Sequence, residues 1–321
     1  MSRRTSDGVQ SVSYIVMALQ GRLGNNLWQF ASGLGIARAV GVRLCFDRRR
    51  VPEPVRLLPD LIGATYREAT PAELRRVGVG SYRPGVPAAL GRVVLRQALE
   101  LERRALHKRP AQKIMYDGED RFREEHFELD LPVYLAGYFQ DERFFAGVAD
   151  EVADSIRWPE GTPSLPGDHG ATVAVSFRRG DFNLFNTGLP LDYYDRAMRL
   201  VADTIDQPTF VLFGDDPEFV DLFAERARHR GYSVVSALAL GADPITQLRL
   251  MSECAHAVLA NSSFAWWGAW LGDRRNERER TVIAPAGWGY LVRAGWIALE
   301  EVPGVATTYD FSTFGPAAAL S

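Results

Sequence analysis

Two arginines and an aspartate follow an apolar run in the second half of the chain. Residues 176–181 read Ser-Phe-Arg-Arg-Gly-Asp. A guanidinium group can bind two phosphate oxygens at once and stays ionised, so Arg178 and Arg179 are candidate phosphate ligands. Asp181 could hold one of these arginines in place or accept a proton. The alternative interpretation is a surface turn closed by an ion pair between arginine and aspartate.

A second candidate is the polar segment Asn261-Ser262-Ser263, which follows another apolar run and precedes a predicted helix. The amide groups and the dipole at a helix N-terminus attract anions, and serine hydroxyls add hydrogen-bond donors. Ser262 is equally suited to cap the helix, since capping and anion binding use the same geometry. This segment is therefore a second candidate for binding a phosphate.

Two further segments lie where predicted strands end. Asp215 and Asp216 follow the run at 209–213, and carboxylates there could accept hydrogen bonds from a nucleotide base or ribose. Asp216 precedes a proline, which makes it equally suited to cap a helix. The glycine turn at 21–26, with Gly24 and Asn25, matches neither the phosphate-binding P-loop nor the dinucleotide-binding fingerprint.

The elements that must position these residues alternate between strands and helices. In the second half we expect strands at 172–177, 209–213, 232–236, 257–260 and 281–284. Between them we expect helices at 191–204, 217–230, 244–254 and 262–271. This alternation predicts a parallel sheet, whose carboxyl-end edge binds ligands in open α/β folds.

The first half repeats the pattern less regularly. Its expected strands are 13–19, 42–46 and 133–136, and its expected helices are 27–40, 92–109 and 142–157. The Pro- and Gly-rich segment 158–167 is the clearest linker. We therefore expect two Rossmann-like domains, 1–160 and 161–321, facing a cleft.

Composition excludes several classes of protein. The 321 residues are 46% hydrophobic and 24% charged with a net charge of −3, so no general basic field recruits nucleic acid. Two cysteines exclude a disulfide scaffold. The five histidines do not have the spacing of metal ligands, and the sequence contains no Asp-x-Asp motif, so nothing in it suggests a metal site. The longest uncharged run has 19 residues but carries Asn, Ser and Trp at its centre, which argues against an integral membrane segment.

These features favour a cytoplasmic protein. The short polar N-terminal segment lacks the apolar stretch of a secretion signal. The basic flank of the helix expected at 92–109 could contact anionic lipid peripherally or a partner, although a solvated face over a core stripe is the more common reason for such a helix.

Taken together, the segments resemble the bacterial α-1,2-fucosyltransferases of glycosyltransferase family 11. That family begins with Gly-Gly-Leu-Gly-Asn-Gln-Met-Phe-Gln-Tyr-Ala, which is similar to residues 21–31. It also carries Gly-Tyr-Phe/Trp-Gln, His-x-Arg-Arg-Gly-Asp-Tyr, Phe-Ser-Asp-Asp, Leu-Met-Ser and Ala-Asn-Ser-Ser-Phe-Ser-Trp-Trp-Gly-Ala-Trp-Leu. The corresponding segments here, in the same order, are 137–140, 176–182, 213–216, 250–252 and 260–271.

The resemblance implies a GT-B-like fold, a GDP-β-L-fucose donor, a glycan acceptor, and no metal or other cofactor. It implies inverting transfer to the 2-hydroxyl of a galactoside, with Arg178 at the diphosphate, helped by Ser262 or Ser263. Asp215 or Asp216 would lie near the nucleoside, and Asp181 is our candidate for the base that deprotonates the acceptor.

The departures from the family pattern leave alternatives open. Ser176 occupies the position of the family's histidine, and a serine cannot carry a charge at neutral pH. Arg22 replaces a glycine, Asn26 a glutamine and Gly214 a serine. A fucosyltransferase of another linkage or acceptor, or a GDP-sugar-binding protein without catalysis, are the alternative functions.

Overall fold

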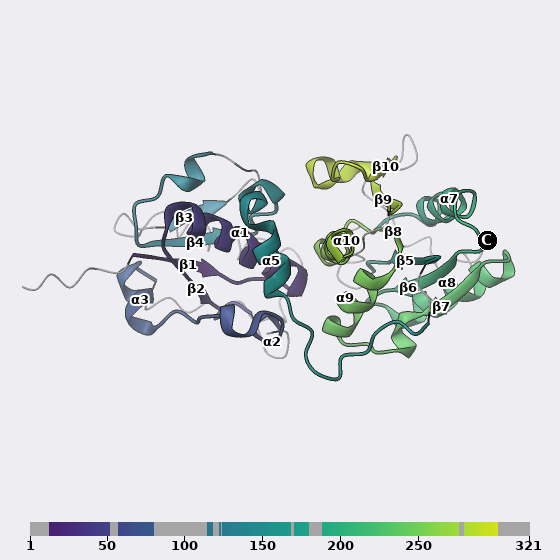
Figure 1. Ribbon diagram of the computed structural model, residues 1–321, viewed down its shortest axis with the longest axis horizontal. Helices are drawn as coiled ribbons and strands as arrows, with labels where there is room; N and C mark the ends of the chain where they lie inside the picture. Colours follow the sequence, from purple (N-terminus) through teal and green to yellow (C-terminus); the bar gives the residue numbers. More distant parts are fainter. Residues whose placement is uncertain are drawn as a thin grey trace, which may run out of the picture. The chain divides into compact units, whose positions relative to one another are not determined.

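The computed structural model describes residues 13–51, 57–79, 114–117, 122, 124–167, 170–179, 188–275 and 279–300. The chain forms two compact units, each built on a parallel sheet (Figure 1). The first unit contains residues 1–20, 28–53 and 64–152, and the second contains 21–27, 54–63 and 153–321. The α/β class and the two Rossmann-like units of a GT-B fold are confirmed, while the boundary after residue 160 stays a prediction.

The described part of the second unit holds six parallel strands in the order β10-β9-β8-β5-β6-β7. The strands are β5 (Thr172–Ser176), β6 (Thr209–Phe213), β7 (Ser233–Ser236), β8 (His256–Val258), β9 (Val282–Pro285) and β10 (Ile297–Leu299). The helices are α2 (Leu58–Ile62), α7 (Leu191–Ala202), α8 (Pro217–His229), α9 (Pro244–Glu253) and α10 (Ser263–Arg275).

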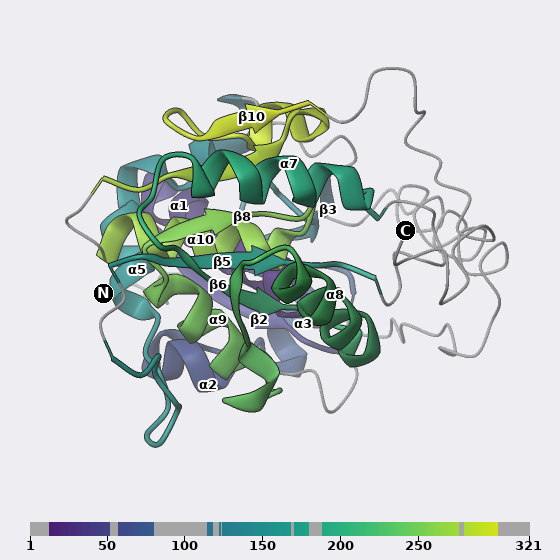
Figure 2. The ribbon, with the colours of Figure 1, turned by 90° about the vertical axis from the view of Figure 1, so that its right-hand side faces the viewer.

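Alternating side chains of β5 divide the core of this unit into two layers. Val173 and Val175 pack with residues of α7 and α8, whereas Ala174 packs with residues of α9 and α10. Figure 1 shows the two helix pairs on opposite faces of the sheet, and Figure 2, turned by 90°, shows the side that carries α7 and α8. Because β6 and β7 extend the sheet on one side of β5 and β8 to β10 extend it on the other, the strand order reverses between β5 and β8.

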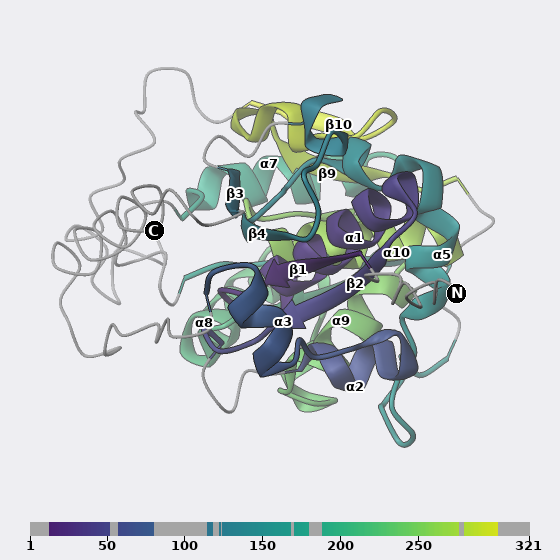
Figure 3. The same cartoon turned by 90° about the vertical axis from the view of Figure 1, so that its left-hand side faces the viewer.

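The first unit is smaller. Its described strands form a parallel sheet in the order β2-β1-β4-β3, with β1 (Tyr14–Ala18), β2 (Arg43–Asp47), β3 (Ile114–Asp117) and β4 (Val133–Gly137). Its helices are α3 (Pro71–Arg76), the part of α1 (Leu23–Val40) from residue 28 onward, and the part of α5 (Ala149–Ser155) up to residue 152. Figure 3 views this sheet with α1 and α3. Val16 packs with Leu74 of α3, whereas Met17 lies near Gly33 of α1, so these helices cover opposite faces.

Several predicted elements differ from the structure. Helix α1 begins at Leu23, not at residue 27, so the glycine turn forms its first turns. The helix expected at 142–157 is two 3₁₀ turns, Glu142–Phe144 and Ala146–Val148, followed by the short α5. The last helix continues to Arg275, and β10 was not expected. The helix expected at 92–109, with its proposed lipid contact, lies outside the described residues.

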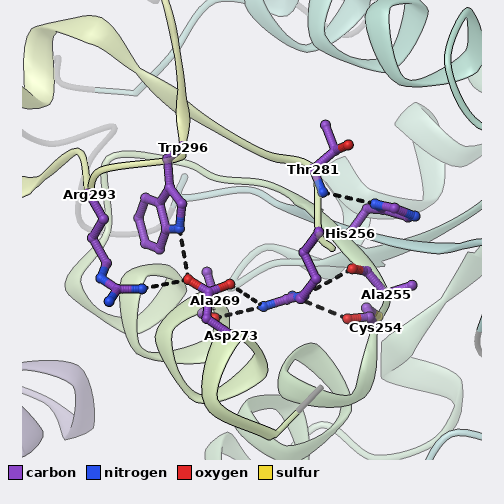
Figure 4. A network of polar contacts seen from close by, with 9 residues as sticks. Cys254, Ala255, His256, Ala269, Asp273, Thr281, Arg293 and Trp296 are labelled. Carbon is purple, nitrogen blue, oxygen red and sulfur yellow. Dashed lines mark hydrogen bonds and ion pairs between the residues drawn. The ribbon is translucent and has the colours of Figure 1, made fainter. Parts of the chain in front are cut away.

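A polar network fixes the amino-end edge of the second sheet, at the opposite ends of the strands from the predicted ligand edge (Figure 4). The buried guanidinium of Arg280 donates to the carbonyl oxygens of Cys254, Ala255 and Ala269 at 3.1, 2.9 and 2.8 Å and to Asp273 at 2.7 Å. These bonds tie the ends of α9 and α10 to the start of β9. Among the described residues, no helix combines the length and hydropathy that a membrane crossing requires.

Candidate donor site

The structure brings three of the predicted segments to one edge of the second sheet. Strands β8, β5 and β6 are neighbours and parallel, so the residues after their carboxyl ends lie next to one another. These residues are Asn261, Ser262 and Ser263 after β8, Arg178 and Arg179 after β5, and Asp215 and Asp216 after β6. They flank the point between β5 and β8 where the strand order reverses, which is where open α/β sheets bind ligands.

Asp215 organises the segment that follows β5. One carboxylate oxygen, Oδ2, pairs with the Arg178 guanidinium, and the other, Oδ1, accepts from the Arg179 backbone amide at 2.8 Å. The side chains of Arg178 and Asp215 are 17% and 20% exposed. The carboxylate therefore holds the Arg178 guanidinium at the sheet edge while leaving part of it accessible.

Arg179 lies inward from its neighbour. Its guanidinium carbon is 4.2 Å from the centre of the Phe219 ring, and the residue is only 8% exposed. Burial lowers the pKa of this guanidinium, although Tyr194 and the two aspartates at 215 and 216 oppose the effect. The Arg179 side chain thus packs over an aromatic cluster, and contact between it and a donor stays a prediction.

Asp216 caps helix α8. Its Oδ1 atom accepts from the Phe219 amide at 3.1 Å, and Pro217 occupies the first helical position. This cap is one of the two interpretations that the sequence left open for Asp216. Nucleoside binding through either Asp215 or Asp216 stays a prediction.

Helix α10 directs its N-terminus toward the same edge. The Trp266 amide donates to the Ser262 carbonyl at 2.9 Å, so Ser262 holds the capping position. The tryptophans at 266, 267 and 270 are buried in the second unit. The positive end of the helix dipole therefore lies at the start of this segment, near residues 261–263.

Gly24 and Asn25 lie against this N-terminus, and both belong to the second unit. A Cβ atom on Gly24 would lie 2.5 Å from the Phe264 backbone nitrogen, so only glycine fits there. The Ser263 hydroxyl donates to the Asn25 side-chain oxygen at 2.9 Å. The glycine turn and the start of α10 thus form a tightly packed pair of helix N-termini.

Ser176 makes a contact that sequence reasoning missed. It is 4% exposed, and its hydroxyl oxygen accepts from the Ala260 amide at 2.8 Å. The hydroxyl therefore joins the end of β5 to the turn that leads into α10. The sequence carried no signal for this contact, because so short a side chain can join only neighbouring strands and periodicity does not reveal which strands are neighbours.

Asp181, the candidate base, lies outside the described residues. Within the described ranges, the structure contains no group of three or more His, Cys, Asp or Glu side chains arranged to hold a metal ion. The described part of the site is thus built from guanidinium groups, carboxylates, hydroxyls and helix N-termini.

The family model described as glycosyl transferase family 11 matches residues 109–288, more than half of the chain. The chain belongs to this family. It is 28% identical to an O-antigen biosynthesis glycosyltransferase from Escherichia coli, WbnK, over 48% of this chain and 54% of that protein. An α-1,2-colitosyltransferase from the same organism is 25% identical over 58% of this chain and 67% of that protein. The chain thus spans about half the length of the first relative and two thirds of the second.

Two solved structures are also similar to this member of family 11. POFUT1 in complex with GDP-fucose has 14% identity and a TM-score of 0.48, with 84% of this chain and 97% of that chain covered. The fucosyltransferase NodZ from Bradyrhizobium has 13% identity and a TM-score of 0.42, with 81% and 92% covered.

Proposed function

We propose that the protein is an inverting, metal-independent fucosyltransferase that moves L-fucose from GDP-β-L-fucose to the 2-hydroxyl of a galactoside. The observation that carries this proposal is the position of Arg178 and the N-terminus of α10 on adjacent strand ends, where the sheet order reverses. The second unit binds the donor, and the N-terminal part of the chain, residues 1–160, contributes the acceptor side. Membership in family 11 supports a glycosyl transfer reaction.

The proposed reaction is a single displacement. The acceptor oxygen bonds to C1 of fucose as the bond from C1 to the β-phosphate oxygen breaks, and its electron pair leaves on the diphosphate. The acceptor proton passes to a base, for which Asp181 is the candidate. Backside attack converts the β-linked donor into an α-linked product.

The charge that develops on GDP requires compensation from the protein. Arg178 supplies a guanidinium that Asp215 already orients, so little reorganisation is needed at the moment of reaction. The N-terminus of α10 and the Ser262 or Ser263 hydroxyl add dipoles aimed at the same edge. This arrangement supports stabilisation of a leaving diphosphate without metal coordination.

A second donor sugar also has support. One relative is named an α-1,2-colitosyltransferase, and colitose is the 3-deoxy analogue of L-fucose. The name supports an α-1,2 linkage and adds the 3-deoxy sugar as a candidate donor. Because Ser176 replaces the family's histidine, transfer with another linkage and GDP-sugar binding without catalysis remain the alternatives.

The deciding experiment incubates the purified protein with GDP-fucose or GDP-colitose, with and without EDTA, against a glycan array, followed by NMR of the product linkage. We expect an α-1,2 galactoside product whose yield EDTA does not change. Another linkage would overturn the assigned regiochemistry, and loss of activity with EDTA would overturn metal independence. GDP binding by calorimetry without transfer or donor hydrolysis would establish the non-catalytic alternative.

A further inference from the structure

Arg22 directly precedes helix α1, at a position that ordinarily favours other residues. Its carbonyl oxygen accepts the first helical hydrogen bond, from the Asn26 amide at 3.0 Å, so Arg22 occupies the N-cap. Serine, threonine, aspartate and asparagine are preferred there, and a cation is disfavoured by the positive end of the helix dipole. The first turn of α1 contains no acidic residue to offset this charge. Local stability therefore does not explain an arginine at this position.

Neighbouring contacts fix where Arg22 lies. Gly21 has a φ of +77°, and the Asn25 side chain packs so closely on it that an added Cβ would lie 2.4 Å from Asn25 Nδ2. Asn25 in turn accepts from Ser263, and Gly24 lies against the Phe264 backbone. Through these contacts the turn packs against the N-terminus of α10, within the second unit.

From this turn, the Arg22 side chain reaches the pair formed by Arg178 and Asp215. Arg22 Nη1 lies 3.8 Å from Asp215 Oδ2, the same oxygen that the Arg178 guanidinium contacts. Two guanidinium groups thus converge on one carboxylate oxygen, beside two helix N-termini. Guanidinium groups placed in this way beside helix N-termini suit a ligand with several negative charges, such as a diphosphate.

We propose that Arg22 is a second guanidinium of the donor site and contacts the leaving diphosphate beside Arg178. The inference rests on the proposed function and names a ligand residue for that same site. The Arg22 side chain is 57% exposed, and its ion pair with Asp215 is long, so the pair contributes little to folding. The guanidinium can shift by rotation of its long side chain toward phosphate oxygens that enter at this edge.

The test measures calorimetric affinities for GDP and for guanosine, together with kcat, in Arg22→Ala and Arg22→Lys. We expect Arg22→Ala to weaken GDP binding and lower kcat by about tenfold or more, with guanosine affinity unchanged, since loss of a charge-assisted hydrogen bond costs on that order. Arg22→Lys should recover part of the loss. The matched control is Arg38→Ala, because Arg38 is 55% exposed and also pairs with one carboxylate, Glu151.

A double-mutant cycle separates direct contact from an effect through Asp215. If Arg22 binds the diphosphate, its removal still weakens GDP binding in an Asp215→Asn background. The inference would be overturned if removal of Arg22 had no effect in the Asp215→Asn background, or if Arg22→Ala behaved as Arg38→Ala does. In either case, transfer of fucose by the wild type would leave the proposed function intact. A wild type that does not bind GDP would overturn both.

Discussion

Arg178 has the geometry of a preorganised anion ligand. Its guanidinium is held by a carboxylate from the neighbouring strand end, and a small part of the side chain is exposed. An arginine held in this way loses little side-chain entropy when a phosphate binds. The same contact shows that Asp215 acts directly on Arg178.

We predict that Arg178→Ala lowers kcat on the order of 10² to 10³-fold and weakens GDP binding, since removal of one preorganised donor has effects of that size. Arg196→Ala is the control, because Arg196 pairs with Asp192 on α7 of the same unit. Steady-state kinetics and calorimetry measure the effect, and circular dichroism checks the fold. Undiminished turnover in Arg178→Ala would contradict the assigned role.

Ser176 provides a prediction about stability. Replacement by alanine leaves the Ala260 amide without its acceptor, and an unsatisfied buried amide costs about 1–3 kcal/mol. Ser236 also ends a strand of this sheet, but its buried hydroxyl has no hydrogen-bond partner in the described part of the chain. Urea unfolding should therefore show a loss for Ser176→Ala and little or no loss for Ser236→Ala. Equal losses of unfolding free energy in the two variants would mean that the hydrogen bond between Ser176 and Ala260 does not stabilise the fold.

At the scale of elements, the sequence predicted the second unit better than the first. The run at 209–213 matches β6 residue for residue, and the helices that cover it deviate by a few residues at their ends. The apolar runs are nearly continuous there because β5, β6, β8 and β9 are buried on both faces. Glycines misled the prediction for α1, since Gly24 is a helical residue selected by its contact with Phe264.

The candidate site could be predicted only in part. Parallel strands place their following residues at one edge, which the sequence pattern indicated for Arg178, Asp215 and Ser262. The partner of each side chain depends on which strands are neighbours, and periodicity does not reveal strand order. The tie between Ser176 and Ala260, and the inward position of Arg179, are therefore results of the structure.

Close packing of α9 against α10 gives a prediction at this scale. A Cβ on Gly268 would lie 2.3 Å from Met251 Sδ and 3.0 Å from its Cβ, so the Met251 side chain or the two helices would have to shift. Gly268→Ala should cost about 1–3 kcal/mol despite the higher helix propensity of alanine. Gly147→Ala is the control, because nothing lies within 4 Å of its added Cβ. Chemical denaturation would contradict the clash if both variants kept wild-type stability.

At the scale of the whole molecule, protonation of His256 at the amino-end edge of the second sheet should make the stability of the fold depend on pH. His256 is buried, and its Nδ1 atom accepts from the Thr281 amide at 3.0 Å (Figure 4). Burial lowers the pKa of this imidazole, and the nearby Arg280 guanidinium lowers it further. The unfolded chain, with an ordinary pKa near about 6.5, therefore takes up the proton more readily than the folded chain.

It follows that stability should fall as the pH drops below about 6.5, and that this group contributes no pH dependence well above that value. His256→Asn keeps an acceptor oxygen but does not titrate, so its unfolding free energy should change less between about pH 7 and pH 5. Urea unfolding across this range measures the difference. The exposed His229 on α8 offers the control His229→Asn, and a wild-type pH profile in His256→Asn would refute the explanation.

The assignment of residues 21–27 and 54–63 to the second unit has a consequence for recombination between related enzymes. A hybrid gene with one breakpoint in the segment 158–167 would take the turn that carries Gly24 from one parent. The N-terminus of α10, against which this turn packs, would come from the other parent. Mismatched parents would then lose the fit between Gly24 and Phe264. Exchange of the first unit between such proteins therefore requires additional crossovers that keep both short stretches with the C-terminal parent.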